Sequence, residues 1–296
     1  MTLRKRFCAL VGVPLAVLLT AFFPATHAGA QPVASHKDRL FSYPALIETR
    51  DGGQYRIVDY REARDIDRRD EVPERRVKRA YVDGEARRAT KTLNLDTSSG
   101  PLTARYVGSL AGARMVTIYI HGSGGNSKQG VNDFSFGGNF NRIKALMLKS
   151  GGAYIAPDAG SFEGADKARL AALSERIASS SPAARFVLAC GSSGAAICYH
   201  FADDASLIPR LAGFILLGGY PDDSYRSSRA GRARVPLMIA HGSRDTVFDV
   251  GRLETFYAAL RKSGIPTMMV RFETGTHGTP IRMIDWRDTL NWILTN

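Results

Sequence analysis

The chain has 296 residues, of which 44% are hydrophobic and 23% are charged, so it can bury a sizeable core and is not a disordered chain. Its formal charge of +12 suits anionic surroundings such as lipid headgroups or acidic polysaccharide, but it carries no nucleic-acid-binding motif. We therefore expect a solvated basic surface and no nucleic-acid partner. Three cysteines are too few for a disulfide framework.

The first thirty residues have the pattern of an export signal. Basic residues at positions 4–6 precede an apolar run over residues 7–23, and the small residues 28–30 offer a cleavage site after Ala30. A retained membrane anchor is disfavoured because the run is short and contains Pro14, and a lipoprotein is disfavoured because Cys8 is not at the cleavage point. The sequence predicts a signal peptide over residues 1–30 and a periplasmic or secreted mature protein without stable membrane insertion.

Residues 31–296 are expected to form a single domain, since no repeat, low-complexity tract or linker interrupts them. Its first part, about 38–100, begins with a pattern of two antiparallel strands between residues 41 and 60, around the turn residues 51–53. Residues 61–79 are dominated by Arg, Asp and Glu and offer no apolar stripe. This predicts a solvated excursion, with a binding site for an acidic partner as the alternative.

From about residue 102 to 296, short apolar runs alternate with helical patterns. This alternation is typical of an α/β fold, a mostly parallel central sheet flanked by helices. The predicted helices are 139–149, 167–179, 193–201, 252–262 and 284–294. The predicted strands are 102–107, 115–120, 153–156, 186–189, 213–217, 237–240 and 268–272, and we expect the first to pair antiparallel with the N-terminal hairpin.

Two cysteines, Cys190 and Cys198, remain in the predicted mature chain. If Cys190 ends a strand and Cys198 lies about two turns into the next helix, their backbones are too far apart for an easy bridge. We therefore predict two small, buried apolar side chains and no disulfide.

The strongest local pattern is the stretch 185–196, in which an apolar strand runs into a turn of small residues and then a helix. A serine at such a turn adopts a strained conformation, and its neighbours must be small because strand and helix come close together. The stretch resembles the GxSxG nucleophile motif of the α/β-hydrolase family. Either Ser192 is central, with Cys190 in place of the first glycine, or Ser193 is central, with Ala195 in place of the last. We favour Ser192, because the strand then ends at the usual distance before the nucleophile.

Residues 121–126, His-Gly-Ser-Gly-Gly-Asn, follow the predicted strand 115–120 and resemble the HGGG-type oxyanion loop of the same family. Backbone N–H groups in such a loop can approach an acyl oxygen because no Cβ blocks them. The resemblance implies that Ser123 or Gly124 supplies one donor and the N–H of Ser193 the other. His121 is expected to have a structural role.

The run 236–248 resembles the HGxxDxxV pattern of this family, in which the aspartate serves as the acid of the catalytic triad; here that aspartate is Asp245. Asp249 and Asp158 are the competing carboxylates, and either of them could instead cap a helix or lie on the surface. The polar loop 273–279 places His277 after the last predicted strand, so serine, acid and histidine follow the family order, each at a strand end. Four other histidines lie in places that do not suit a catalytic base, namely His27, His36, His200 and His241.

The resemblance covers residues 102–296 and implies a serine hydrolase that cleaves carboxylic esters through an acyl-enzyme, with Ser192, Asp245 and His277 as its triad and without a metal or organic cofactor. Residues 220–234 are too few and too polar to form an apolar lid, so we expect an ester with a small or polymer-borne acyl group. A serine peptidase of the same fold, and an inactive protein that binds a cell-envelope polymer, are the alternatives.

Three phenylalanines in the stretch 131–140 are candidate substrate-binding residues. Phe134, Phe136 and Phe140 stand among glycines and asparagines and would line an acyl or aromatic pocket. The alternative is that one or more of them pack beneath the loop. The oligomeric state has no signal in the sequence.

Overall fold

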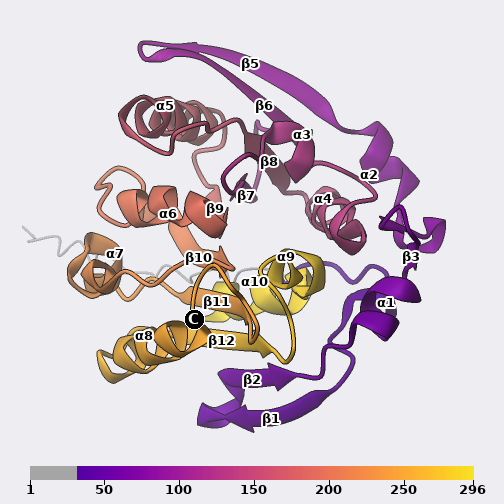
Figure 1. Ribbon diagram of the computed structural model, residues 1–296. Helices are drawn as coiled ribbons and strands as arrows, with labels where there is room; N and C mark the ends of the chain where they lie inside the picture. The colour runs from indigo at the N-terminus through magenta and orange to yellow at the C-terminus, as the bar shows by residue number, and fades with distance from the viewer. Residues whose placement is uncertain (1–31) are drawn as a thin grey trace, which may run out of the picture. The chain divides into compact units, whose positions relative to one another are not determined.

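A mixed sheet of ten strands lies at the centre of residues 32–296, the part of the chain that the computed structural model describes (Figure 1). The predicted signal peptide, including Cys8 and His27, lies outside these residues. The strand order is β1-β2-β12-β11-β10-β9-β7-β8-β6-β5. The strands are β1 (Leu46–Arg50), β2 (Tyr55–Val58), β5 (Lys91–Thr97), β6 (Gly100–Gly108), β7 (Met115–Ile120), β8 (Ala153–Pro157), β9 (Arg185–Gly191), β10 (Leu211–Leu217), β11 (Leu237–Gly242) and β12 (Thr267–Phe272).

The strands from β2 to β8 in this order run parallel, whereas β1, β6 and β5 pair antiparallel with their neighbours. This confirms the predicted α/β sheet, and every strand predicted after residue 102 is present. The predicted pairing of strand 102–107 is wrong, because β6 lies between β5 and β8 while the N-terminal hairpin lies at the opposite edge, beside β12. Strand β5 was not predicted, because it is an edge strand that buries little of its polar sequence.

Helices cover both faces of the sheet (Figure 1). Because successive side chains of a strand point to opposite faces, the central strands are apolar throughout: Val116 and Ile118 of β7 contact one core cluster and Tyr119 the other. One face carries α5 (Gly164–Ser180), α6 (Ala195–Phe201), α7 (Arg229–Arg232) and α8 (Val250–Lys262), and the other α4 (Asn139–Lys149), α9 (Thr279–Met283) and α10 (Trp286–Thr295). The short helices α1 (Asp38–Phe41), α2 (Gly84–Arg88) and α3 (Ser127–Gly130) complete the α-helices of residues 32–296.

The direction of chain progression reverses at the centre of the sheet. Strand β8 lies on one side of β7, and the chain then crosses back to form β9 on the other side. In sheets of this kind, ligands bind beyond the carboxyl ends of the strands at such a reversal. The loops that follow β7 and β9 are therefore where a site is expected.

Cys190 and Cys198 form a disulfide, so the prediction that they remain separate is wrong. Their Cα atoms lie 6.3 Å apart, within the range of about 4.4–6.8 Å that a disulfide requires. The strand-to-helix turn is tighter than the sequence suggested, since α6 begins four residues after β9 ends and leads straight back over the strand. The bridge joins the end of β9 to α6 within the core.

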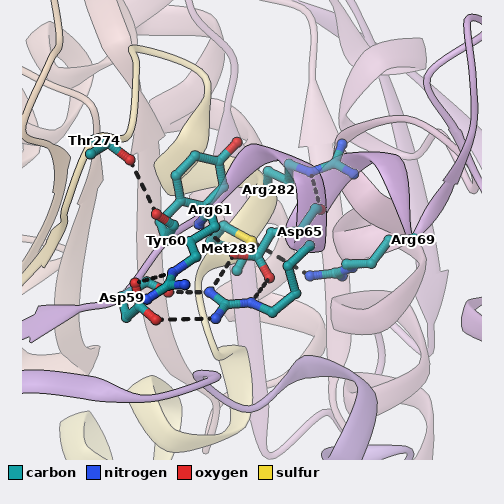
Figure 2. Close-up of polar contacts among 9 residues, drawn as sticks. Asp59, Tyr60, Arg61, Asp65, Arg69, Thr274, Arg282 and Met283 are labelled. Atoms are coloured by element: carbon teal, nitrogen blue, oxygen red, sulfur yellow. Dashed lines mark hydrogen bonds and ion pairs between the residues drawn. The ribbon is translucent and has the colours of Figure 1, made fainter.

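The charged segment 61–79 is mostly exposed, as the sequence predicted, but buried residues anchor it to the rest of the protein. It forms a π-helical turn (Ala63–Asp67) and a small sheet of β3 (Asp70–Glu71) and β4 (Arg76–Val77), and it buries Asp65, Arg69 and Asp70. Figure 2 shows this segment against residues close to the C-terminus of the chain. A run of mixed charges in a sequence looks fully solvated when the groups that pair with some of those charges are distant in sequence.

Within residues 32–296, no helix has the length and apolar composition needed to cross a membrane.

Candidate active site

Ser192 lies in the sharp turn between β9 and α6. Its φ of 49° is in the left-handed region, which a residue with a side chain adopts only at a cost. A Cβ added to Gly194 would lie 2.5 Å from the carbonyl oxygen of His121, and one added to Gly122 would lie 2.9 Å from the Cβ of Ser192. Glycine at both positions therefore lets the loop after β7 rest directly against the turn that presents Ser192.

The side chains of Ser192, His277 and Asp245 form one chain of hydrogen bonds. The hydroxyl of Ser192 donates to Nε2 of His277 over 2.8 Å, and Nδ1 of His277 donates to Oδ2 of Asp245 over 2.7 Å. The imidazole is about one third exposed, whereas the Asp245 carboxylate is fully buried. The structure thus brings together the serine of the favoured register, the aspartate and the histidine, from the ends of three different strands.

Backbone and side-chain groups hold the Asp245 carboxylate in place. Its Oδ1 accepts the N–H groups of Val247 and Phe248 over 2.8 and 3.1 Å. The buried ring of His241 lies on the other side, with Nε2 3.3 Å from Oδ2 of Asp245 and 2.8 Å from the carbonyl oxygen of Phe248. Because a carbonyl only accepts, Nε2 carries the proton, and burial lowers the pKa of His241, which keeps the ring neutral.

His241 was not predicted as part of the site, although one signal could have found it. It stands four residues before Asp245 at the same strand end. The ring of Phe248 was also missed; its centroid lies 5.8 Å from that of His277, with the planes crossing edge to face.

The competing carboxylates have structural roles. Asp249 is the N-cap of α8 and accepts the N–H of Arg252 over 3.0 Å, and Asp158 accepts the N–H of Ser127 over 2.6 Å. Within residues 32–296, no group of three or more His, Cys, Asp or Glu side chains lies together in a way that could hold a metal ion.

The remaining histidines lie apart from the triad. His121 accepts the N–H of Ala159 at Nε2 over 3.0 Å, so its Nδ1 carries the proton and donates to the carbonyl of Gly122 over 2.8 Å. His36 pairs with Asp83, and His200 is exposed on α6. His121 therefore holds the shape of the loop after β7.

The loop after β7 presents two exposed residues beside Ser192. A turn closes between the carbonyl of Gly122 and the N–H of Gly125, 3.0 Å apart, with Ser123 and Gly124 at its tip. In residues 32–296, no protein acceptor takes the N–H of Ser123 or Gly124. Ser193, the other predicted donor, is the middle residue of the 3-10 turn Ser192–Gly194 that leads into α6.

Comparisons with known proteins show which fold this chain shares. No protein-family model matches the chain, and no curated protein matches it. A thermostable esterase of known structure superposes with a TM-score of 0.55 at 14% identity, covering 70% of this chain and 63% of that chain. The α/β-hydrolase fold is established by this likeness. The fluorophosphonate-binding serine hydrolase F of Staphylococcus aureus superposes with a TM-score of 0.52 at 10% identity, over 70% of this chain and 99% of that chain.

An α/β serine hydrolase homologue from Coxiella burnetii has the same fold, with a TM-score of 0.51 at 17% identity over 68% of this chain and 95% of that chain. At such low identity these likenesses concern the α/β-hydrolase fold and not the activity. The arrangement of side chains in this chain must carry any functional argument.

One of the three phenylalanines predicted to bind substrate lies next to the residue that follows His277. Phe136 faces Gly278, with Cε1 3.7 Å from where a Cβ would stand on that glycine. Phe140 is fully buried and packs on Tyr119, with ring centroids 4.9 Å apart, so it lies beneath the loop. Phe134 lies under the guanidinium group of Arg76, 4.2 Å from the ring centroid.

Proposed function

We propose that the protein is a serine hydrolase that cleaves carboxylic esters through an acyl-enzyme. The observation that carries this proposal is the hydrogen-bonded chain from Ser192 through His277 to Asp245, on a fold shared with esterases and serine hydrolases. An inactive polymer-binding protein has less support, because all three side chains are within bonding distance. Among residues 32–296, no contact favours a peptidase over an esterase.

The proposed reaction assigns each group one task. Nε2 of His277 takes the proton of the Ser192 hydroxyl as its oxygen attacks the acyl carbon, and Asp245 holds the ring in the required tautomer and stabilises its charged form. The N–H groups of Ser193 and of Ser123 or Gly124 would hold the oxyanion. His277 then gives the proton to the leaving alcohol as the ester bond breaks. In the second half of the reaction His277 takes a proton from water, whose oxygen attacks the acyl carbon, and returns that proton to Ser192 as the carboxylic acid is released.

We further propose a substrate with a small or polymer-borne acyl group. The segment between β10 and β11 supports this, because it consists of short turns and α7, and its buried Tyr225 packs against Phe214 in the core instead of covering the triad. The His277 side chain remains about one third exposed. An open site of this kind suits an ester group carried on a larger molecule.

We also propose that the protein is exported to an oxidising compartment. The signal pattern in residues 1–30 and the Cys190–Cys198 disulfide both support this, since structural disulfides persist mainly outside the cytosol. Cell fractionation and N-terminal sequencing would test it: a chain beginning at Gln31 outside the cytosol is expected, and an unprocessed cytosolic chain would contradict it.

The catalytic proposal is tested by hydrolysis of p-nitrophenyl esters, from acetyl to long acyl chains. We expect turnover of short chains, a loss of at least about 10⁴-fold in kcat for Ser192→Ala, and retained activity in the matched control Ser193→Ala. Labelling by a fluorophosphonate probe should follow the same order. A folded wild type that neither hydrolyses any ester nor reacts with the probe would overturn the proposal.

A further inference from the structure

Residues 58–79, which comprise the end of β2 and the charged segment 61–79, contact the chain before and after His277 in the sequence (Figure 2). Before His277, the hydroxyl of Thr274 donates to the carbonyl of Tyr60 over 3.1 Å. The N–H of Glu273 donates to the carbonyl of Val58 over 3.0 Å, which continues the pairing of β12 with β2. The entry to the His277 loop is therefore tied to residues more than 200 positions earlier in the sequence.

After His277, the same segment holds helix α9. Nε of Arg282 donates to the carbonyl of Asp65 over 3.0 Å, and its Nη2 lies 2.7 Å from Oδ1 of Asp70. Arg69 reaches the same place, with Nη2 donating to the carbonyl of Gly137 over 3.1 Å and Nη1 3.5 Å from the sulfur of Met283. The Asp70 side chain is fully buried and that of Arg282 is 8% exposed, so this ion pair is shielded from water.

The segment is also braced within itself. The Asp65 carboxylate accepts the N–H of Arg61 over 2.9 Å and pairs with Arg64 over 2.8 Å. Arg64 contacts Asp59 as well. These bonds fix the turn that aims the Asp65 carbonyl at Arg282.

Helix α9 cannot hold its own position, because it has five residues and so short a helix is marginal by itself. A side chain from outside the helix bonds the carbonyl groups at its C-terminal end. Nδ2 of the buried Asn139 lies 3.1, 3.0 and 2.9 Å from the carbonyl oxygens of Ile281, Arg282 and Ile284. The helix begins two residues after His277. Its placement, and with it that of the imidazole, depends on tertiary contacts.

We propose that Tyr60, Asp65, Arg69 and Asp70 form a clamp that positions His277 against Ser192 and Asp245, with Arg282 as the positioning residue on which the clamp acts. The proposal rests on the proposed function of the triad. Arg282 touches none of the reacting atoms; it fixes the helix that follows the base. Since a displacement of about 1 Å in an active site can lower the rate about 10²-fold, loosening the clamp should lower kcat and leave KM nearly unchanged.

The test uses the full-length mature protein and the double variant Asp70→Leu/Arg282→Met. Replacing both members of a buried ion pair with apolar side chains leaves neither member without its partner, so this variant should fold with a melting temperature close to that of the wild type. We expect kcat for p-nitrophenyl acetate to fall about 10- to 100-fold at an unchanged KM. Arg282→Lys can keep the ion pair with Asp70 but not the hydrogen bond to Asp65. Its kcat should therefore lie between that of the wild type and that of the double variant.

The matched control is Arg75→Met, which removes an exposed ion pair with Glu62 in the same segment and should leave kcat unchanged. A second readout does not need turnover: the low-field proton resonance of His277 Nδ1 should be sharp in the wild type and control, and broadened or lost in the double variant. A folded double variant with wild-type kcat and an unchanged resonance would overturn the clamp. An inactive wild type would overturn the proposed function instead, and the resonance would still test the clamp.

Discussion

The turn that carries Ser192 and the loop that carries His277 are built in different ways. The turn is held by groups close in sequence, namely a left-handed serine, tight glycines and a disulfide that spans eight positions. The His277 loop is held by Tyr60 and Asp65, which are 214 and 217 positions from the residues they bind. Ser192 is therefore positioned by local contacts, whereas His277 is positioned by contacts between distant parts of the folded protein.

The largest expected effect comes from the residue that joins the His277 loop to the rest of the triad. Asp245→Asn should keep the Ser192 turn intact but lower kcat about 10⁴-fold, because an amide can hold the imidazole in the wrong tautomer. Steady-state kinetics on a short-chain ester measures this. Asp249→Asn, which alters only a helix cap, is the matched control and should keep most of the activity. Equal activity in the two variants would remove Asp245 from the proposed triad.

A smaller effect is expected from the disulfide beneath the Ser192 turn. The double variant Cys190→Ala/Cys198→Ala should lose about 2.5 kcal/mol of unfolding free energy, the chain-entropy value for a loop of this length. Because the glycine contacts remain, kcat should change less than threefold. Denaturant unfolding with a parallel ester assay checks both values, and a large fall in kcat without a loss of stability would show that the bridge, and not the glycines, sets the turn.

The smallest effect concerns His241, the buried neutral ring beside Asp245. Its pKa in the folded protein is lowered by burial below its ordinary value of 6.5, so the unfolded chain binds the proton more readily. Its stabilising contribution is therefore present above pH 6.5 and lost as the pH falls below it, by at most about 1.4 kcal/mol per pH unit.

His241→Gln keeps an N–H donor towards Phe248 and removes this titration. The unfolding free energy of the variant should fall less steeply than that of the wild type between pH 6.5 and pH 5. Denaturant titrations at several pH values measure the slopes. Identical slopes for wild type and His241→Gln would contradict the expectation.

The sequence predicted helices and strands correctly where the residues of one short stretch determine its structure. Helix α4 has the predicted bounds of residues 139–149, and the strands leading to Ser192 and Asp245 lie where continuous apolar runs predicted them. Small residues at 191–195 indicated a tight turn, because only such side chains let a strand and a helix meet. The edge strand β5 was missed since it lacks a buried face.

By itself, the sequence determined the α/β architecture and the residues at the carboxyl ends of the strands, because burial on both faces of a sheet and tight turns impose their own residue types. The tertiary structure alone decided the bond between Cys190 and Cys198, the position of the N-terminal hairpin beside β12, and the burial of Phe140 beneath its loop. It also decided that Asp70 meets Arg282 inside the protein. The partners of a buried charge are chosen by the fold, since only the fold brings together residues that are distant in sequence.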